Sequence, residues 1–203
     1  MAEVHHAVAA VEAGCDLVVA QGTEAGGHTG TVATMALVPQ VADAVGERVP
    51  VVAAGGIVDG RGLAAALTLG ADGVWIGTRF IATPEAWGTA GYKERLLQMH
   101  EDDTVVTRAF TGKTCRVNRN AYTQSYENGE RTIKPFPAQY LQSIEDGANH
   151  LGGGTDTAVD PDQEFWPAGQ GVGAIDAVVP AGDLVRSFVA AAEAVLARVN
   201  ALR

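Results

Sequence analysis

Short apolar runs alternate with helical segments over the first 80 residues, and glycine follows each run within two residues. This repeat predicts an α/β fold in which parallel strands are joined by right-handed helical crossovers. The runs are apolar throughout instead of alternating with polar residues, which predicts strands buried on both faces. The expected strands are Asp16–Ala20, Pro50–Ala54 and Asp72–Ile76, and the expected helices are Val4–Ala13, Met35–Val45 and Arg61–Leu69.

The alternation stops after Phe80, and the remaining chain has a mixed pattern. A closed (β/α)₈ barrel needs eight strands and about 250 residues, and only three such runs are present. Either the sheet is open and small, or the chain begins in the middle of a barrel. Beyond Phe80 we expect helices at Tyr92–Met99, Pro137–Ala148 and Asp183–Arg198, a strand at Val105–Phe110, and loops at Ala121–Arg131 and Gly152–Asp162.

The net charge of −10 and the isoelectric point near 4.8 limit the partners of the chain. An acidic surface repels a nucleic acid, so we expect no nucleic-acid binding. A single phosphate group is different, because backbone N–H groups can hold it without net positive charge. The length of 203 residues suits one sizeable core.

The two cysteines, Cys15 and Cys115, form no dense disulfide framework, which favours a reducing, cytoplasmic location. The first residues do not resemble a signal peptide, and no apolar run is long enough to span a bilayer, so we expect no membrane association. No cluster of His, Cys and carboxylate side chains shows metal-ligand spacing, and we therefore expect no metal site.

Three glycine-containing segments follow the predicted strands: 21–30, 54–57 and 77–78. The carboxyl ends of parallel strands form one face, where ligands bind, so we expect these segments to converge. Glycine lets backbone N–H groups approach an anion closely, and the Thr78 hydroxyl can donate to a phosphate oxygen. The simpler alternative is that these glycines only allow tight strand-to-helix turns.

His28 is the titratable residue of most interest, because it lies in the first of these glycine-rich segments. Its side chain ordinarily titrates near neutral pH and can take or give a proton. Glu24 lies close in sequence and could orient it, although a solvated loop carboxylate is the more common case. A solvent-exposed histidine without a catalytic role is the alternative interpretation.

Three motifs in this order resemble the nitronate monooxygenase family, formerly called 2-nitropropane dioxygenase. They are Ala20-Gln-Gly-Thr-Glu-Ala-Gly-Gly-His-Thr-Gly30, Val51-Val-Ala-Ala-Gly-Gly-Ile-Val-Asp-Gly-Arg-Gly62 and Gly73-Val-Trp-Ile-Gly-Thr-Arg-Phe80. The resemblance covers residues 1–120 and resumes at Trp166-Pro-Ala-Gly-Gln-Gly171 and the terminal helix.

The resemblance implies an FMN-binding (β/α)₈ barrel of the TIM type. Residue by residue, His28 matches the active-site histidine, and Gln21 and Gly26 match positions that face the flavin. The phosphate-binding positions of the family match Gly55, Gly56, Gly77 and Thr78. The implied reaction oxidises alkyl nitronates or nitroalkanes with O₂ to carbonyl compounds and nitrite, and the histidine removes a proton from a neutral nitroalkane.

The resemblance also predicts how the chain is divided. Residues 1–120 match the C-terminal part of the barrel, 121–165 form an insertion on the substrate side, and 166–203 return as a helix on the barrel. The earlier strands of the family are absent, so we expect an N-terminally truncated, partial barrel with about three parallel strands.

Three functions remain open on the sequence: an FMN-dependent nitronate monooxygenase, an FMN-dependent enoyl-acyl-carrier-protein reductase that uses NAD(P)H, and an inactive barrel fragment. The expected partners of the first are a small-molecule substrate and O₂, and the sequence leaves open a homo-oligomer.

Overall fold

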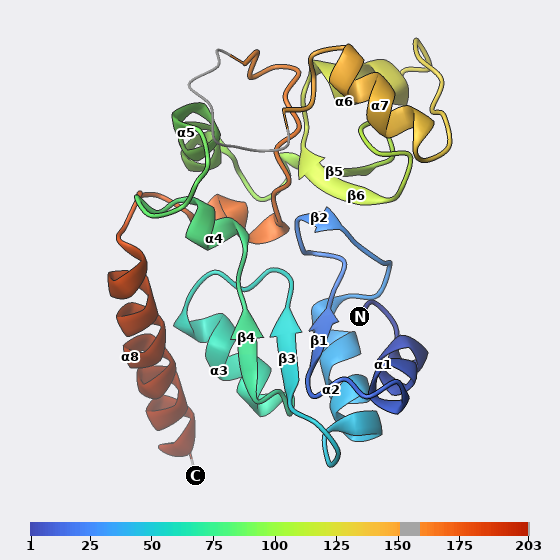
Figure 1. Cartoon of the computed structure of the whole chain (residues 1–203). Coiled ribbons are helices and arrows are strands. Elements are labelled where there is room, and N and C mark those ends of the chain that lie inside the picture. Colours follow the sequence, from blue (N-terminus) through green and yellow to red (C-terminus); the bar gives the residue numbers. More distant parts are fainter. Residues whose placement is uncertain (151–158, 203) are drawn as a thin grey trace. The chain divides into compact units, whose positions relative to one another are not determined.

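The computed structural model describes residues 1–150 and 159–202, which fold into two compact units. The first unit comprises Met1–Ala25, Thr29–Gly77 and Val179–Arg203, and the second comprises Gly26–His28 and Thr78–Val178 (Figure 1). The predicted loop at Gly152–Asp162 lies mostly outside the described residues.

The first unit is an α/β unit with a parallel sheet. Its strands are β1 (Val18–Gln21), β3 (Val51–Ala54) and β4 (Gly73–Trp75), in the order β1-β3-β4. Val18 pairs with Val51 and Val52 pairs with Gly73, both in parallel register. Its helices are α1 (Val4–Glu12), α2 (Thr34–Val45), α3 (Gly60–Thr68) and α8 (Ala181–Asn200). The predicted strand–helix alternation and parallel pairing are therefore confirmed for the first 80 residues.

Only one face of β1 and β3 is fully buried, and no residue of β4 is buried. Val18, Ala20, Val51 and Ala53 point into a core shared with α1 and α2, and all four are at most 1% exposed. The intervening residues of β1 and β3 are half-buried, and Trp75 of β4 is 65% exposed. The predicted burial of the strands on both faces was therefore wrong for this unit. Among the described residues, these strands belong to one buried core, which they form together with the helices of the unit.

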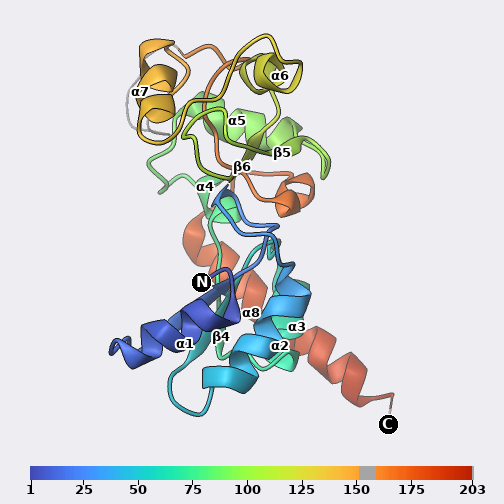
Figure 2. The same ribbon diagram turned by 90° about the vertical axis from the view of Figure 1, so that its right-hand side faces the viewer.

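Helices α3 and α8 pack side by side in both views (Figures 1 and 2). A Cβ atom on Gly60 would lie 2.5 Å from the Phe188 carbonyl oxygen, so the two helices meet at a glycine. The Asp59 side chain accepts hydrogen bonds from the backbone N–H groups of Arg61 and Gly62, which caps α3 at its start.

The second unit contains an antiparallel sheet in the order β2-β6-β5, formed by β2 (Gly27–His28), β5 (Thr104–Thr107) and β6 (Cys115–Asn118). His28 pairs with Cys115, and Thr107 pairs with the same residue from the other side. Its helices are α4 (Thr78–Ile81), α5 (Ala90–Gln98), α6 (Ala121–Glu127), α7 (Ala138–Glu145) and the 3₁₀ helix η1 (Gln170–Ala174).

The predicted loop at Ala121–Arg131 was wrong, because most of it is α6. Asn120 accepts a hydrogen bond from the Thr123 backbone N–H, and the Thr123 hydroxyl lies 3.1 Å from the Asn120 nitrogen. This reciprocal capping box begins a helix whose Tyr122 and Tyr126 pack into an aromatic core. Among the described residues, no helix is both long enough and apolar enough to cross a membrane.

Candidate functional site

The predicted site residues fall in both units and are described unit by unit. Gln21, Gly55, Gly56 and Gly77 belong to the first unit, at or just beyond the carboxyl ends of β1, β3 and β4. Gly26, His28 and Thr78 belong to the second unit.

In the first unit, the glycines after β1 and β3 pack around Thr34 at the start of α2. A Cβ atom on Gly22 would lie 2.1 Å from the Thr34 Oγ1, and one on Gly55 would lie 2.6 Å from it. Gly55 also has a φ of +111°, a conformation that other residues rarely adopt. The fold itself therefore requires glycine at Gly22 and Gly55, whatever ligand binds nearby.

Glu24 has a different partner from the one suggested by the sequence. Its carboxylate accepts hydrogen bonds from the Thr34 backbone N–H, at 2.9 and 3.1 Å, and from the Thr34 hydroxyl at 2.9 Å. A carboxylate at the start of α2 also interacts favourably with the helix dipole. Glu24 thus anchors the loop after β1 to the start of α2.

Gly77 is the one predicted phosphate-binding glycine for which the fold shows no need. Its φ lies outside the left-handed region, and an added Cβ would have no atom within 4 Å. By contrast, Gly56 has a φ of +69° and lies against Glu24. Absence of a side chain at Gly77 leaves the backbone beyond β4 open to close approach by a ligand.

In the second unit, Gly26 and Thr78 meet the same short segment, Ala168–Gly169. A Cβ on Gly26 would lie 2.7 Å from the Ala168 carbonyl carbon and 2.8 Å from the Gly169 nitrogen. The Gly169 N–H donates a hydrogen bond of 3.0 Å to the Thr78 hydroxyl oxygen. That hydroxyl retains its own proton for donation, so the contact is compatible with the role predicted for Thr78.

His28 is held at the edge of the antiparallel sheet, with its ring exposed to solvent. Its Nε2 lies 3.0 Å from the hydroxyl oxygen of Thr111, which is 4% exposed. Thr111 is in turn fixed by the backbone of Lys113: its hydroxyl lies 3.1 Å from the Lys113 carbonyl oxygen and 3.2 Å from the Lys113 nitrogen. A rigid hydroxyl therefore sets the orientation of the imidazole ring.

The pKa of His28 is lowered from its ordinary value, first by partial burial and second by the positive charge of Lys113. A lowered pKa keeps the imidazole neutral, and so able to accept a proton, to lower pH than usual. Burial raises the pKa of the Cys115 thiol to about 12, so this neighbour of His28 stays protonated and is no thiolate nucleophile at neutral pH.

Next to His28 the second unit has a cavity of about 620 Å³, here called the apolar pocket. Apart from His28 and Thr111 its side chains are mostly apolar, and many belong to the 121–165 segment. The lining residues are Gly27, His28, Thr111, Cys115, Phe136, Pro137, Tyr140, Leu141, Phe165 and Pro167. No local sequence pattern marks Thr111 or this pocket, because the lining residues are far apart in the sequence and come together only in the folded unit.

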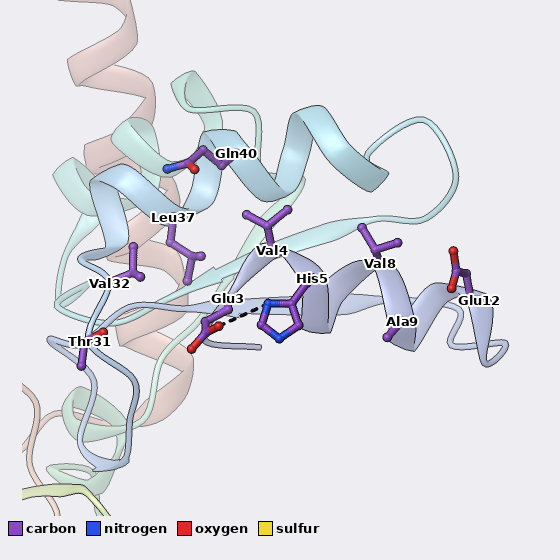
Figure 3. A pocket seen from close by; sticks show the side chains of 10 residues that line it. All are labelled: Glu3, Val4, His5, Val8, Ala9, Glu12, Thr31, Val32, Leu37 and Gln40. Atoms are coloured by element: carbon purple, nitrogen blue, oxygen red, sulfur yellow. Dashed lines mark ion pairs between the residues drawn. The ribbon is translucent and has the colours of Figure 1, made fainter.

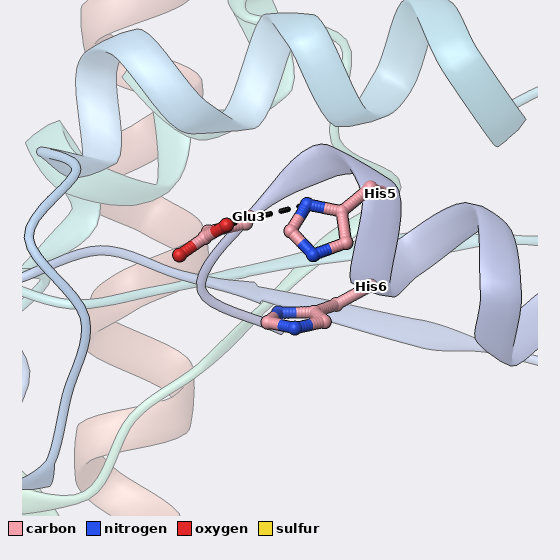
Figure 4. Close-up of side chains that lie close together, drawn as sticks. All are labelled: Glu3, His5 and His6. Carbon is pink, nitrogen blue, oxygen red and sulfur yellow. Dashed lines mark ion pairs between the residues drawn. The ribbon is translucent and has the colours of Figure 1, made fainter.

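A second hollow lies in the first unit, between α1 and α2 (Figure 3). Glu3 and His5 are among the residues that line it. Their ligand atoms and that of His6 all lie within 4.8 Å of one another (Figure 4). His5 Nδ1 lies 3.2 Å from the Glu3 carboxylate. All three side chains are exposed, and none of them is a predicted site residue. The expectation that no such cluster exists was wrong, whereas the expected lack of a metal ion remains a prediction.

Replacing Lys113 with methionine is expected to raise the pKa of His28, because the change removes the nearby positive charge and keeps an apolar chain against Phe136. The pH below which His28 becomes protonated should therefore move upward. The measurement is an NMR pH titration of the His28 ring in the whole chain. Lys134→Met is the matched control, since Lys134 is not among the causes of the shift; an equal titration of wild type and Lys113→Met would contradict the assignment.

Comparison with known proteins gives a consistent set of relatives. Residues 1–191 match the family model described as nitronate monooxygenase. A protein of Staphylococcus haemolyticus named "Probable nitronate monooxygenase" is 43% identical over 147 residues, which are 67% of this chain and 41% of that protein. This chain therefore spans less than half the length of that relative.

Two solved structures are similar over nearly the whole chain. FabK from Thermotoga maritima superimposes with a TM-score of 0.85 at 33% identity, covering 100% of this chain and 62% of FabK. Nitroalkane oxidase from Streptomyces ansochromogenes superimposes with a TM-score of 0.79 at 31% identity, covering 98% of this chain and 58% of the oxidase.

Proposed function

Because the chain belongs to the nitronate monooxygenase family, we propose that it carries the phosphate-binding and proton-accepting parts of an FMN-dependent enzyme that oxidises alkyl nitronates or nitroalkanes with O₂. The products are a carbonyl compound and nitrite. The similarity to a nitroalkane oxidase supports the choice of substrate class. In this proposal β1, β3 and β4 are strands of a (β/α)₈ barrel, and residues 121–165 form the substrate side.

The open space around Gly77 is the observation that carries the cofactor assignment. Gly55 has a structural reason to be glycine, whereas Gly77 lies in open space with an ordinary backbone conformation. Close approach by an anionic group explains a glycine there, and the exposed backbone beyond β4 suits the phosphate of FMN. Gly55, Gly56, Gly77 and Thr78 would hold this phosphate.

The remaining predicted residues are assigned to the flavin ring and to the substrate. Gln21 and Gly26 would face the flavin, which when bound supplies the oxidising chemistry. His28 would remove the proton on the carbon beside the nitro group of a neutral nitroalkane. The C–H electron pair then becomes part of the nitronate, and the proton moves to the imidazole, whose orientation Thr111 fixes.

The test of this function uses the purified whole chain supplied with FMN. Nitrite should be released from an alkyl nitronate in the presence of O₂ and without NADH. NADH oxidation that depends on an enoyl thioester, with no nitrite release, would instead select the enoyl-acyl-carrier-protein reductase. A chain that binds FMN but shows neither activity would be the inactive fragment.

A further inference from the structure

The apolar pocket beside His28 has a polar end and an apolar remainder. His28 and Thr111 form the polar end, where the Lys113 charge also acts on His28. The Lys113 Nζ lies 4.1 Å from the centroid of the Phe136 ring, which belongs to the apolar wall. An elongated ligand with an anionic head and an apolar tail matches this distribution of charge.

The apolar wall consists of the segment before α7 and the first turns of α7. This wall is anchored to the protein core. Gln139 is completely buried, and its amide nitrogen donates a 2.8 Å hydrogen bond to the Tyr126 hydroxyl. The Gln139 amide oxygen accepts a 2.9 Å hydrogen bond from the Lys134 backbone N–H. A Cβ on Gly112 would lie 2.7 Å from the Phe136 nitrogen, so the wall also packs tightly on the turn that holds Thr111. The pocket is therefore formed before a ligand binds, which lowers the entropic cost of binding.

The size of the pocket exceeds what a small nitroalkane needs. Its volume of about 620 Å³ falls within the range of cavities that bury most of a drug-sized ligand. A nitroalkane of two or three carbons would leave most of the apolar wall in contact with water. A longer alkyl chain would remove that wall from water and gain the corresponding hydrophobic free energy.

We propose that the apolar pocket binds the unbranched alkyl chain of the substrate and makes the enzyme selective for longer-chain alkyl nitronates. The nitronate head lies at His28, and the chain runs along the wall that contains Phe136 and Leu141. This inference rests on the proposed function. The acyl chain of an enoyl thioester has the same apolar chemistry and is distinguished by the test.

The first measurement is kcat/KM for the nitronates of unbranched nitroalkanes from nitroethane to nitrooctane. Each methylene buried in the pocket should raise kcat/KM about fourfold until the pocket is filled, since burying one methylene from water is favourable by a nearly constant amount. Equal kcat/KM values along the series would overturn the proposal.

Leu141→Asn tests the wall directly. The Leu141 side chain lines the pocket and is 54% exposed, so the substitution leaves the buried core intact. We expect a flattened dependence of kcat/KM on chain length. Ile144→Asn is the matched control, because Ile144 is on the same helix, is 41% exposed and does not line the pocket. It should keep the full dependence; an unchanged dependence in Leu141→Asn, or an equal loss in both variants, would overturn the proposal.

A binding experiment separates this inference from the proposed function. Alkyl carboxylates from butanoate to decanoate carry a planar anionic head like that of a nitronate and undergo no turnover. Isothermal titration calorimetry with the whole chain should show affinity that rises with chain length and is weakened by Leu141→Asn. This result without nitrite release from any nitronate would support the pocket and refute the proposed function.

The opposite combination is also decisive. Nitrite release at equal kcat/KM for every chain length, with carboxylate affinity independent of length, would support the function and refute the pocket. NADH oxidation that rises with the acyl length of enoyl thioesters, without nitrite release, would overturn the assignment of the pocket to nitronates.

Discussion

Replacing His28 with alanine is expected to lower kcat/KM on a neutral nitroalkane by about 10² to 10⁴, the usual contribution of a general base. The neutral substrate must lose the proton beside its nitro group, and His28 is the base assigned to take it. A nitronate has already lost that proton, so its oxidation should be largely retained in His28→Ala. Steady-state assays of both substrate forms, with the FMN content of each preparation measured by absorbance, provide the check.

His6→Ala is the matched control for this variant, because His6 is an exposed histidine on α1 outside every predicted site. It should leave both activities unchanged. An equal loss on neutral nitroalkane and nitronate in His28→Ala would contradict the role of His28 as a base. Such a result would assign it instead to substrate binding or to the arrangement of the sheet edge.

Replacing Gly77 with valine is expected to weaken FMN binding about ten- to hundredfold while leaving the thermal midpoint of the protein unchanged. The stability should persist because an added Cβ meets no atom within 4 Å and the backbone φ is ordinary. The affinity should fall because a side chain would block the approach of the phosphate to the backbone. A hydrogen bond to a charged group contributes about 1.5 to 3 kcal/mol, which corresponds to that loss.

Gly73→Val is the control for the same strand. Gly73 lies in β4, also with an ordinary φ and no atom within 4 Å of an added Cβ, but it precedes the carboxyl end of the strand. Its replacement should change neither FMN affinity nor stability. Equal weakening of FMN binding by both substitutions would show that the Gly77 effect is not specific to the predicted phosphate site.

The strands and helices of the first unit could be predicted because local signals and tertiary structure agree there. Apolar runs of four or five residues stopped by glycine became β1, β3 and β4, and the helices between them begin or end within two residues of the predicted bounds. Burial on both faces did not follow from this pattern. Apolar composition shows that a strand tolerates burial, but what covers each face depends on the rest of the structure.

The second unit was harder to predict because its sheet depends on pairing between segments that are far apart in the sequence. The two-residue strand at His28 is formed by pairing with Arg116 and Cys115 of β6, and no local pattern marks it. Helix α6 did have a local signal, the capping pair Asn120 and Thr123. The polar composition of the segment conceals it, since only Tyr122 and Tyr126, one helical turn apart, mark an apolar face.

For the site, the sequence identified candidate residues but not their partners. Glu24 is close to His28 along the chain, yet it binds Thr34 at the start of α2. The hydrogen-bond partner of His28 is Thr111, 83 residues away. The structure also separates the glycines by their physical reason. Backbone conformation or packing explains Gly26 and Gly55, whereas neither explains Gly77.

The most direct test of the account is an equilibrium titration of FMN with the whole chain, followed by the quenching of flavin fluorescence. We predict saturable binding at one site, weakened in Gly77→Val and unchanged in Gly73→Val. Circular dichroism would verify that the chain is folded. If such a chain binds no FMN, even after refolding in the presence of FMN, the central claim that the ends of β3 and β4 hold the flavin phosphate is contradicted.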